Sequence, residues 1–595
     1  MNSVTAARAW LKQDPDPVTR AELEEVLARV DAGDAAAAAD LDDRFSSRLA
    51  FGTAGLRGRL GAGSNRMNRV LIGQAAAGLA AYVRSHSTDA TPTVVIGYDG
   101  RRNSDVFARD SAEIFAGAGL RAVLLPRLLP TPVLAFAVRH LGAAAGVMVT
   151  ASHNPPDDNG YKVYLGGPDG GSQIVSPADA EIAAQIQRVA DAGDLAAVPR
   201  SDAFELAGEE IVDAYVAATA LVAPAPAGAA GLTWVYTAMH GVGHETLAQI
   251  LEVAGYPLPV VVSEQIEPDG TFPTVAFPNP EEPGAMDLAF ATAQAAGAEV
   301  ILANDPDADR LAVAVPDASA PGGWRQLTGN QVGLLLGWRA ARRAAGKTGA
   351  AGAGEAPVGK TGAAGAGEAP VGGGATAAGL QGAITPDSAA AASLACSLVS
   401  SPGLQVVAEH YGLDFHSTLT GFKWISRAPG LVFGFEEALG YLVNPETVRD
   451  KDGISAAIAI LGMIAEAREQ GRTLGDLVTQ FQETFGFFDS GQVSLRVEDV
   501  SIIGRLMATL RAAPPASIGD VAVERVEDLL TVADGEPSGD ILRLWLADGS
   551  RVLVRPSGTE PKLKVYLDVR GTSAADAAAR LASLEAGART LLAGA

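Results

Sequence analysis

Short apolar runs alternate with alanine-rich amphipathic segments over most of the chain. The segment 106–117 has the apolar spacing of a helix. Runs of this kind that are flanked by polar turns predict strands at 93–98, 122–125, 146–149, 233–236 and 299–304. Alternation of strands with helices is typical of βαβ units. The pattern therefore predicts an α/β protein with mixed or parallel sheets.

The N-terminal residues are predicted to form helical packing elements without chemistry of their own. Thr19 and Glu22 follow a proline-containing turn at the spacing of a capping box, which predicts a helix from there to about Val30. Gly33 allows a second helix to start before Ala35.

Length and changes of composition divide the chain into several domains. A chain of 595 residues is too long for one hydrophobic core. Alternating alanine and proline at 223–227 indicate a linker, and a more β-rich, charged sequence starts near Gly486. The predicted domains are 1–222, 228–326, 327–484 with a low-complexity insert at 340–379, and 486–595.

The insert contains an exact internal duplication and a formal match to a P-loop. Residues 346–358 recur unchanged at 359–371, and the stretch from Gly354 to Thr361 matches the glycine-lysine-threonine pattern. A functional P-loop follows a strand and opens a helix, whereas this match follows glycine-alanine-rich sequence and spans the junction of the repeat. We interpret the match as accidental, which leaves a P-loop kinase without support.

Charge and cysteine content narrow the class of protein. The formal net charge is −24, which disfavours nucleic acid and anionic membranes as partners. Cys396 is the single cysteine, so an internal disulfide is excluded and a reducing compartment is favoured. Residues 1–16 have no apolar segment of signal-peptide length, and no long uninterrupted apolar stretch predicts a membrane span. These features predict a soluble cytoplasmic protein. We expect it to be a monomer or a homodimer.

A small polar loop, Thr-Ala-Ser-His-Asn-Pro-Pro, follows the predicted strand at 146–149. Loops at the carboxyl edge of such sheets are where open α/β folds bind ligands. We expect Ser152 to lie on a short turn with its hydroxyl exposed, with His153 and Asn154 nearby. A polar loop without a function would have the same composition.

Three carboxylates, Asp305, Asp307 and Asp309, follow the predicted strand at 299–304. In an extended segment all three would point to one side, where their charges repel unless a cation lies among them. Oxygen ligands suit Mg²⁺ or Ca²⁺. An EF-hand is excluded because Arg310 and Pro316 stand where that loop needs glycine and glutamate. A solvent-facing acidic turn is the alternative.

Two further segments suggest anion binding. The glycine-rich turn at 51–58 contains Arg57, whose planar fork suits a phosphate. The segment 555–564 combines an arginine, two hydroxyls, a glycine and lysines, which together make an anion cradle. An acidic protein needs such a local basic pocket for an anionic substrate, although a polar hairpin turn would look similar.

Taken together, these segments resemble motifs of the α-D-phosphohexomutases, the phosphoglucomutase and phosphomannomutase superfamily. The similar segments, in the order of the family, are the Gly-Leu-Arg-Gly turn at 55–58, the serine loop at 150–155, the Asp-x-Asp-x-Asp-Arg loop at 305–310, the Phe-Gly-Phe-Glu-Glu segment at 433–437 and the loop at 555–564. Thr-Gly-Phe-Lys-Trp at 420–424 is most similar to the longer phosphoglucomutase/phosphopentomutase-like branch. The resemblance implies four domains around a central cleft, three of them α/β with mixed sheets and the last a smaller α+β domain.

The resemblance also implies roles for individual residues. It implies that Ser152 carries a phosphoryl group and that Mg²⁺ is bound by Ser152, Asp305, Asp307 and Asp309. The implied catalytic residues are Ser152, His153, Arg57, Lys162 and Lys451. The implied substrate-binding residues are Arg310, Thr420, Gly421, Lys423 and Glu436. The implied phosphate-binding residues are Arg555, Ser557, Gly558, Thr559 and Lys564.

The reaction implied is an intramolecular phosphoryl transfer between O1 and O6 of a hexose, or O1 and O5 of a pentose, through a sugar bisphosphate, which for a hexose is the 1,6-bisphosphate. Glucose phosphates are the expected substrates, with mannose or pentose phosphates as alternatives. A phosphatase would use the same metal and serine but admit water, and a regulatory relative would be expected to have lost the serine or an aspartate. Family members usually have a serine where this chain has Ala438, and many have a histidine at Gly440 or Tyr441. This departure leaves the sugar open.

Overall fold

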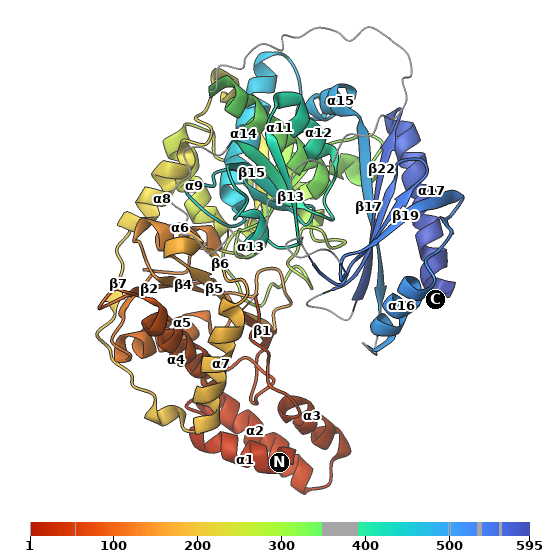
Figure 1. Cartoon of the computed structure of the whole chain (residues 1–595). Helices are drawn as coiled ribbons and strands as arrows, with labels where there is room; N and C mark the ends of the chain where they lie inside the picture. Colours follow the sequence, from red (N-terminus) through yellow and green to blue (C-terminus); the bar gives the residue numbers. More distant parts are fainter. Residues whose placement is uncertain are drawn as a thin grey trace. The chain divides into compact units, whose positions relative to one another are not determined.

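In the computed structural model the chain forms two compact units, residues 1–336 with 421–477 and residues 337–420 with 478–595. Figure 1 shows the elements along the chain. The structure describes residues 2–53, 55–347, 391–497, 499, 501–531, 538–557 and 562–594. Within these ranges, no helix has both the length and the apolar character that a membrane span requires.

Three helices at the N-terminus pack on one another around a small apolar core: α1 (Ser3–Gln13), α2 (Pro17–Asp31) and α3 (Ala35–Phe45) (Figure 1). The two predicted helices are confirmed, and α1 was not predicted. The predicted capping box is wrong. Pro17 occupies the first helical position, so Asp16 is the cap and accepts from the Val18 N–H at 2.9 Å. Thr19 instead donates to Asp14 at 2.8 Å.

The first sheet is mixed, and the serine loop follows one of its central strands. Its strands lie in the order β1-β5-β4-β2-β3-β7, with β6 paired to β5. The strands are β1 (Leu56–Arg59), β2 (Thr93–Tyr98), β3 (Arg121–Leu124), β4 (Ala145–Val149), β5 (Asp158–Leu165), β6 (Ser172–Gln173) and β7 (Glu205–Leu206). The helices of this segment are α4 (Arg69–His86), α5 (Ser104–Gly117), α6 (Thr131–His140) and α7 (Ala178–Ala192). β2 runs parallel to β3 and β4, whereas β5 runs antiparallel to β4 and β1. The serine loop connects β4 to β5, so the residues after the serine return along the neighbouring strand.

The second sheet is also mixed, in the order β12-β11-β10-β8-β9. Its strands are β8 (Trp234–Thr237), β9 (Val260–Val261), β10 (Val300–Asn304), β11 (Leu311–Pro316) and β12 (Trp324–Gln326), and its helices are α8 (Glu210–Ala220), α9 (Gly243–Ala254) and α10 (Asp287–Ala296). β10 is parallel to β8 and antiparallel to β11. The turn between β10 and β11 carries the three aspartates.

The third segment again combines parallel and antiparallel strand pairs with helices. Its elements are α11 (Gly329–Lys347), β13 (Ser393–Ser397), α12 (Gly403–Tyr411), β14 (Asp414–Thr418), α13 (Phe422–Ile425), β15 (Leu431–Glu436), β16 (Gly440–Leu442), α14 (Gly453–Glu469) and α15 (Leu474–Phe485). β13 pairs parallel with β14, and β15 pairs antiparallel with β16. The predicted start of the insert at residue 340 is wrong, because α11 continues through alanine- and arginine-rich sequence to Lys347. The duplication from 348 onward and the P-loop match lie outside the described residues.

The C-terminal segment is an antiparallel sheet with two helices. The strands follow the order β17-β22-β21-β20-β19-β18. The elements are β17 (Phe487–Arg496), α16 (Ser501–Ala512), β18 (Ser517–Ile518), β19 (Val521–Asp528), β20 (Leu542–Leu546), β21 (Arg551–Pro556), β22 (Lys562–Gly571) and α17 (Ala574–Gly594). Alternate residues of these strands and one face of each helix form an apolar core. The predicted fold class, α/β domains with mixed sheets followed by a smaller α+β domain, is confirmed. The domain boundaries and the cleft stay predictions.

Candidate active site

Ser152 lies at the carboxyl end of β4 in a left-handed backbone conformation, with φ of 53°. Its N–H donates to the Thr150 hydroxyl at 2.8 Å. Its Oγ donates to Asp305 Oδ2 at 2.8 Å, although the two residues are 153 positions apart. The expectation of an exposed hydroxyl is wrong, since Ser152 is only 3% exposed. The aspartate turn covers it.

Asp305, Asp307 and Asp309 are fully buried, and one oxygen of each lies within 4.8 Å of the others. The predicted extended conformation is wrong. Ala308 has a φ of 54°, and its N–H donates to the Asp305 carbonyl at 2.8 Å. The three carboxylates therefore converge because a tight turn joins two antiparallel strands, not because alternate residues of a strand share a face.

Two lysines contact the aspartate turn. Lys162 Nζ on β5 lies 2.6 Å from Asp307 Oδ2 and 2.9 Å from Asp309 Oδ2. Lys451 Nζ lies 3.0 Å from Asp309 Oδ2. Burial would raise the pKa of Asp309, but Lys162, Lys451 and Arg310 together hold that pKa well below its usual range. Asp309 is therefore ionised over the whole physiological range of pH.

The pKa of Asp305 is shifted in the opposite direction from that of Asp309. Burial, together with repulsion from Asp307 and Asp309, raises the pKa of Asp305 well above its usual range. In addition, Asp307 Oδ1 and Asp309 Oδ1 are buried without a hydrogen-bond donor. Buried acceptors almost always receive a hydrogen bond or bind an ion, so these two oxygens are available to a further ligand. Three converging carboxylates, two of which have a donor-free oxygen, fit a hard divalent cation such as Mg²⁺.

His153, Arg57 and Asn154 complete the serine loop. His153 Nδ1 lies 3.2 Å from Ser152 Oγ. Burial, with Arg310 and Arg57 nearby, lowers the pKa of His153 well below its usual value, so its imidazole is neutral at neutral pH. Arg57 Nη1 donates to Asn154 Oδ1 at 3.1 Å. The structure thus brings the five predicted residues Ser152, His153, Arg57, Lys162 and Lys451 into one region with the aspartate turn.

The predicted sugar-binding residues of the first unit also lie in hydrogen-bonded positions. Glu436, at the end of β15, accepts from the Gly421 N–H at 2.6 Å. The Lys423 ammonium donates to the Thr53 hydroxyl. Arg310 donates its backbone N–H to Asp305 Oδ1 at 3.0 Å, which fixes the arginine beside the aspartate turn.

The predicted phosphate-binding residues of the second unit lie at the open end of the β21–β22 hairpin. Arg555 stands directly opposite Lys564 in the strand register. Thr420 accepts from Arg555 Nη1 at 2.7 Å, and the Ser557 N–H donates to the Lys562 carbonyl at 2.8 Å. Gly558 and Thr559 lie outside the described residues.

Two further residues that contact the site were not predicted. Thr131, at the start of α6, donates its hydroxyl to Asp307 Oδ2 at 2.7 Å and its N–H to the Asp307 carbonyl at 2.9 Å. Its only sequence signal is a Pro-Thr-Pro turn before an apolar helix. Arg101, in the turn after β2, donates to carbonyls of the serine loop. In the sequence it looked like part of an ordinary Asp-Gly-Arg turn.

The segment that carries Lys451 is held by two buried aspartates. Asp450 accepts from the Tyr164 hydroxyl at 2.7 Å and from Gln173 Nε2 at 2.6 Å. Asp452 caps α14 and accepts from the Tyr215 hydroxyl at 3.0 Å. Lys451 therefore lies between two aspartates that are hydrogen-bonded to β5 and β6 of the first sheet and to α8.

The substitution Asp452→Asn is expected to remove part of the pH dependence of stability. Burial raises the pKa of Asp452 to about 6. The folded protein thus binds this proton more tightly than the unfolded chain, so stability falls as the pH rises from about 4 to about 6, and the loss is complete above that. A shift of roughly two pKa units corresponds to about 3 kcal/mol. Asparagine keeps an oxygen that can cap α14.

Melting temperatures of both proteins at about pH 4.5 and about pH 7 check this expectation. On going to the higher pH, the wild type should lose more stability than the variant. An equal loss in the two proteins would contradict the prediction.

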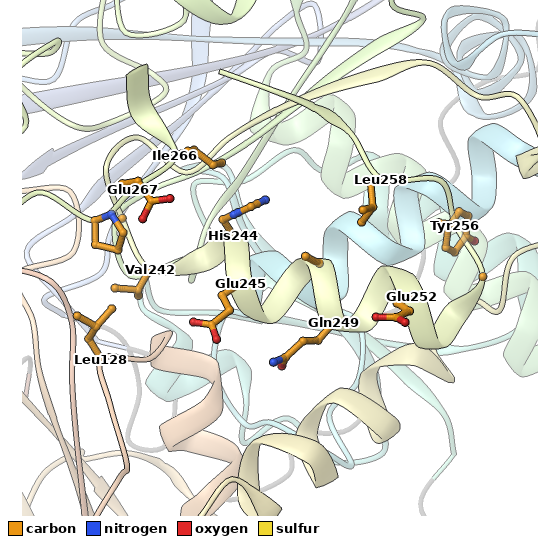
Figure 2. A pocket seen from close by; sticks show the side chains of 14 residues that line it. Leu128, Val242, His244, Glu245, Gln249, Glu252, Tyr256, Leu258, Ile266 and Glu267 are labelled. Carbon is orange, nitrogen blue, oxygen red and sulfur yellow. The ribbon is translucent and has the colours of Figure 1, made fainter. Parts of the chain in front are cut away.

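A hollow on the surface of the second sheet's segment lies along α9 (Figure 2). His244, Glu245, Gln249 and Glu252 of that helix line it, with Leu258 nearby on the following loop. None of the predicted site residues in the described part of the chain belongs to its lining. The candidate active site is therefore the buried serine and aspartate cluster and not this hollow.

Comparison with known proteins identifies the family of this chain. The models of phosphoglucomutase/phosphomannomutase α/β/α domains I, II and III match residues 48–192, 213–320 and 379–485, and the model of the C-terminal domain matches 515–585. The chain belongs to the phosphoglucomutase/phosphomannomutase family. It is thus an isomerase of the intramolecular phosphotransferase type.

Individual relatives in this family carry different names. A probable phosphomannomutase of Haemophilus influenzae is 52% identical over 88% of this chain and 98% of its own length. The mouse phosphopentomutase is 32% identical over 94% of this chain and 89% of its own. The crystal structure of a putative phosphomannomutase from Thermus thermophilus matches with a TM-score of 0.64 at 22% identity, over 92% of this chain and 99% of that one. The last match supports the fold.

Proposed function

We propose that this phosphoglucomutase/phosphomannomutase family member interconverts glucose 1-phosphate and glucose 6-phosphate through a phosphoserine at Ser152. The observation that carries the proposal is the position of Ser152 Oγ, which is buried and lies 2.8 Å from Asp305 beside two further aspartates. A hydroxyl in that place can carry a phosphoryl group against a bound cation.

In the proposed reaction the bond between Ser152 Oγ and phosphorus breaks as a bond forms from phosphorus to the free sugar hydroxyl, whose proton passes to a base of the site. The product is a sugar 1,6-bisphosphate, which turns round and returns its other phosphoryl group to Ser152. Lys162 and Lys451 hold their positive charge, because burial lowers their pKa values less than the aspartates raise them. Both are therefore suited to stabilise phosphoryl oxygens.

We propose that Asp305, Asp307 and Asp309, with an oxygen of the phosphorylated Ser152, bind Mg²⁺. The bound ion would offset negative charge on the transferring phosphoryl group. The two donor-free oxygens of Asp307 and Asp309 support this assignment.

The remaining roles are proposed on residue type and position. Glu436 and the neighbouring Gly421, with Thr420, Lys423 and Arg310, would bind the sugar. Arg555 and Lys564, paired opposite each other on β21 and β22, would bind the phosphate that is not being transferred, together with Ser557, Gly558 and Thr559. The two basic side chains support phosphate binding because charged donors form strong hydrogen bonds with phosphate oxygens.

Mannose and pentose phosphates are the second candidates. Relatives named phosphomannomutase and phosphopentomutase support them, as does Ala438 in the loop where the family usually has a serine. A phosphatase would use the same serine and metal but transfer the phosphoryl group to water, and a mutase must keep water from the phosphoserine.

The test is an assay of the purified protein with Mg²⁺ and a trace of glucose 1,6-bisphosphate. Glucose 1-phosphate, mannose 1-phosphate and ribose 1-phosphate are compared by kcat/KM, and inorganic phosphate is measured in parallel. The highest kcat/KM with glucose 1-phosphate is expected. A higher value with another sugar would replace glucose by that sugar, and phosphate release without isomerisation would overturn the mutase.

A further inference from the structure

The side chain of one buried arginine donates hydrogen bonds to four carbonyl groups of the serine loop. Arg101 Nη2 donates to the carbonyls of Ser152 at 2.6 Å and Asn154 at 2.5 Å. Its Nη1 donates to the carbonyls of Pro155 at 2.8 Å and Asp158 at 3.0 Å. The residue is 3% exposed. Four carbonyls from one short loop thus point at a single guanidinium.

A loop from the second sheet's segment seals this arginine from solvent. The Phe272 ring lies 4.9 Å from Arg101 Cζ, in the geometry of a cation–π contact, and Phe272 itself is 3% exposed. Gly270 of the same loop packs directly on the turn before the arginine, since a Cβ at this position would lie 2.8 Å from the Gly100 carbonyl oxygen. The loop therefore packs on the guanidinium through Phe272 and on the backbone of the turn that carries it through Gly270.

The conformation that Arg101 supports is an unfavourable one. Ser152 has a φ of 53°, which a residue with a side chain adopts only when its surroundings enforce it. The bond from Arg101 to the Ser152 carbonyl fixes the peptide plane that follows the serine, and the bonds to Asn154, Pro155 and Asp158 fix the rest of the loop. A lysine at this position could not make the same four hydrogen bonds, because it lacks the planar guanidinium group that donates to several acceptors at once.

We propose that Arg101, packed against Phe272, is the positioning residue that keeps the serine loop in its strained conformation and aims Ser152 Oγ at the aspartate turn. This inference rests on the proposed function. Within the described part of the chain, the hydrogen bonds of the Arg101 side chain all go to backbone carbonyls of this loop, and its Nε lies 3.7 Å from Asp99 Oδ2. Arg101 therefore acts through Ser152 and not on the substrate. A misplacement of a reacting atom by about 1 Å can lower the rate about 100-fold.

The test uses the full chain with three variants, Arg101→Met, Arg101→Lys and Phe272→Leu, assayed with the best substrate of the wild type. For Arg101→Met we expect kcat to fall about 100-fold while the substrate KM changes less than about threefold, because only the serine is displaced. Arg101→Lys and Phe272→Leu should give smaller losses. Hydrogen exchange of the peptide covering 150–160 should accelerate in each variant, a readout that does not require activity.

Arg66→Met is the matched control. Arg66 is also buried, at 7% exposure, but it contacts Asp43 and the Asn65 carbonyl, away from the serine loop. Its substitution should leave kcat and the exchange at 150–160 unchanged. In a further variant, Arg101→Ala, added guanidinium chloride at low concentration should partly restore kcat, whereas it should leave the kcat of Arg66→Met unchanged.

A wild-type kcat in Arg101→Met, or unchanged exchange at 150–160, would overturn the inference. If Arg101→Met does not fold, Arg101→Lys and Phe272→Leu carry the same two readouts. An inactive wild type would contradict the proposed function instead, and the exchange measurement would still decide whether Arg101 holds the loop.

Discussion

Replacement of Ser152 by alanine will lower kcat on the order of 10⁴-fold or more, as expected when a covalent nucleophile is removed. The protein should stay folded, since the hydroxyl makes one donated bond, to Asp305. The variant should also fail to take up phosphate from glucose 1,6-bisphosphate. Intact-mass measurement of wild type and variant, with and without the bisphosphate, checks this directly.

The matched control is Ser111→Ala. Ser111 is a fully buried serine on α5 that accepts from the Tyr161 hydroxyl at 3.1 Å and has no contact with the aspartate turn in the described structure. Its loss should change stability and leave the phosphorylated state intact. Phosphate on the Ser152→Ala protein, with activity retained, would show that another residue carries the group.

The substitution Asp307→Asn will lower kcat on the order of 10³-fold and weaken Mg²⁺ binding. A bound metal supplies several kcal/mol of stabilisation to a transferring phosphoryl group, and about 1.4 kcal/mol corresponds to a factor of ten in rate. Asp307 Oδ1 has no donor and is free for the metal, while Oδ2 accepts from Thr131 and Lys162. An amide at this place would lose charge and bring an N–H₂ group towards the Lys162 ammonium.

Titration calorimetry with Mg²⁺ and the dependence of kcat on Mg²⁺ concentration measure the effect. Chelation of divalent ions should abolish the activity of the wild type, and added Mg²⁺ should restore it. Asp317→Asn is the control, because Asp317 pairs with Arg325 at 3.0 Å on the turn after β11 and is partly exposed. Unchanged Mg²⁺ affinity in Asp307→Asn would contradict the metal site.

Part of the fold could be predicted because five strands of the first two sheets have a local signal. The strands predicted at 93–98 and 146–149 agree with β2 and β4 within one residue. The helix over 106–117 begins two residues earlier, at Ser104. Helix starts were less predictable: the capping residue of α2 is decided by Pro17 at the first helical position and not by the spacing of Thr19 and Glu22.

The candidate site was predicted as a set of residue types but not as a geometry. The serine and the three aspartates each follow a buried strand, where ligand-binding loops occur. Their burial could not be predicted, because Ser152 is covered by Asp305 from a different sheet. The sequence around Lys162 was also compatible with a surface position, and only the structure shows that this lysine pairs with Asp307 and Asp309.

The sequence by itself determined the α/β class, the positions of five strands in the first two sheets, the acidic character of the protein and the motifs that resemble the phosphohexomutases, because these depend on residues close together along the chain. Only the tertiary structure decided that the aspartates converge through a left-handed turn at Ala308, that Asp450 and Asp452 anchor the segment of Lys451, and that Arg101 gathers the carbonyls of the serine loop. These contacts join residues far apart in the chain, and a short turn with an arginine carries no local sign of the carbonyls it will meet.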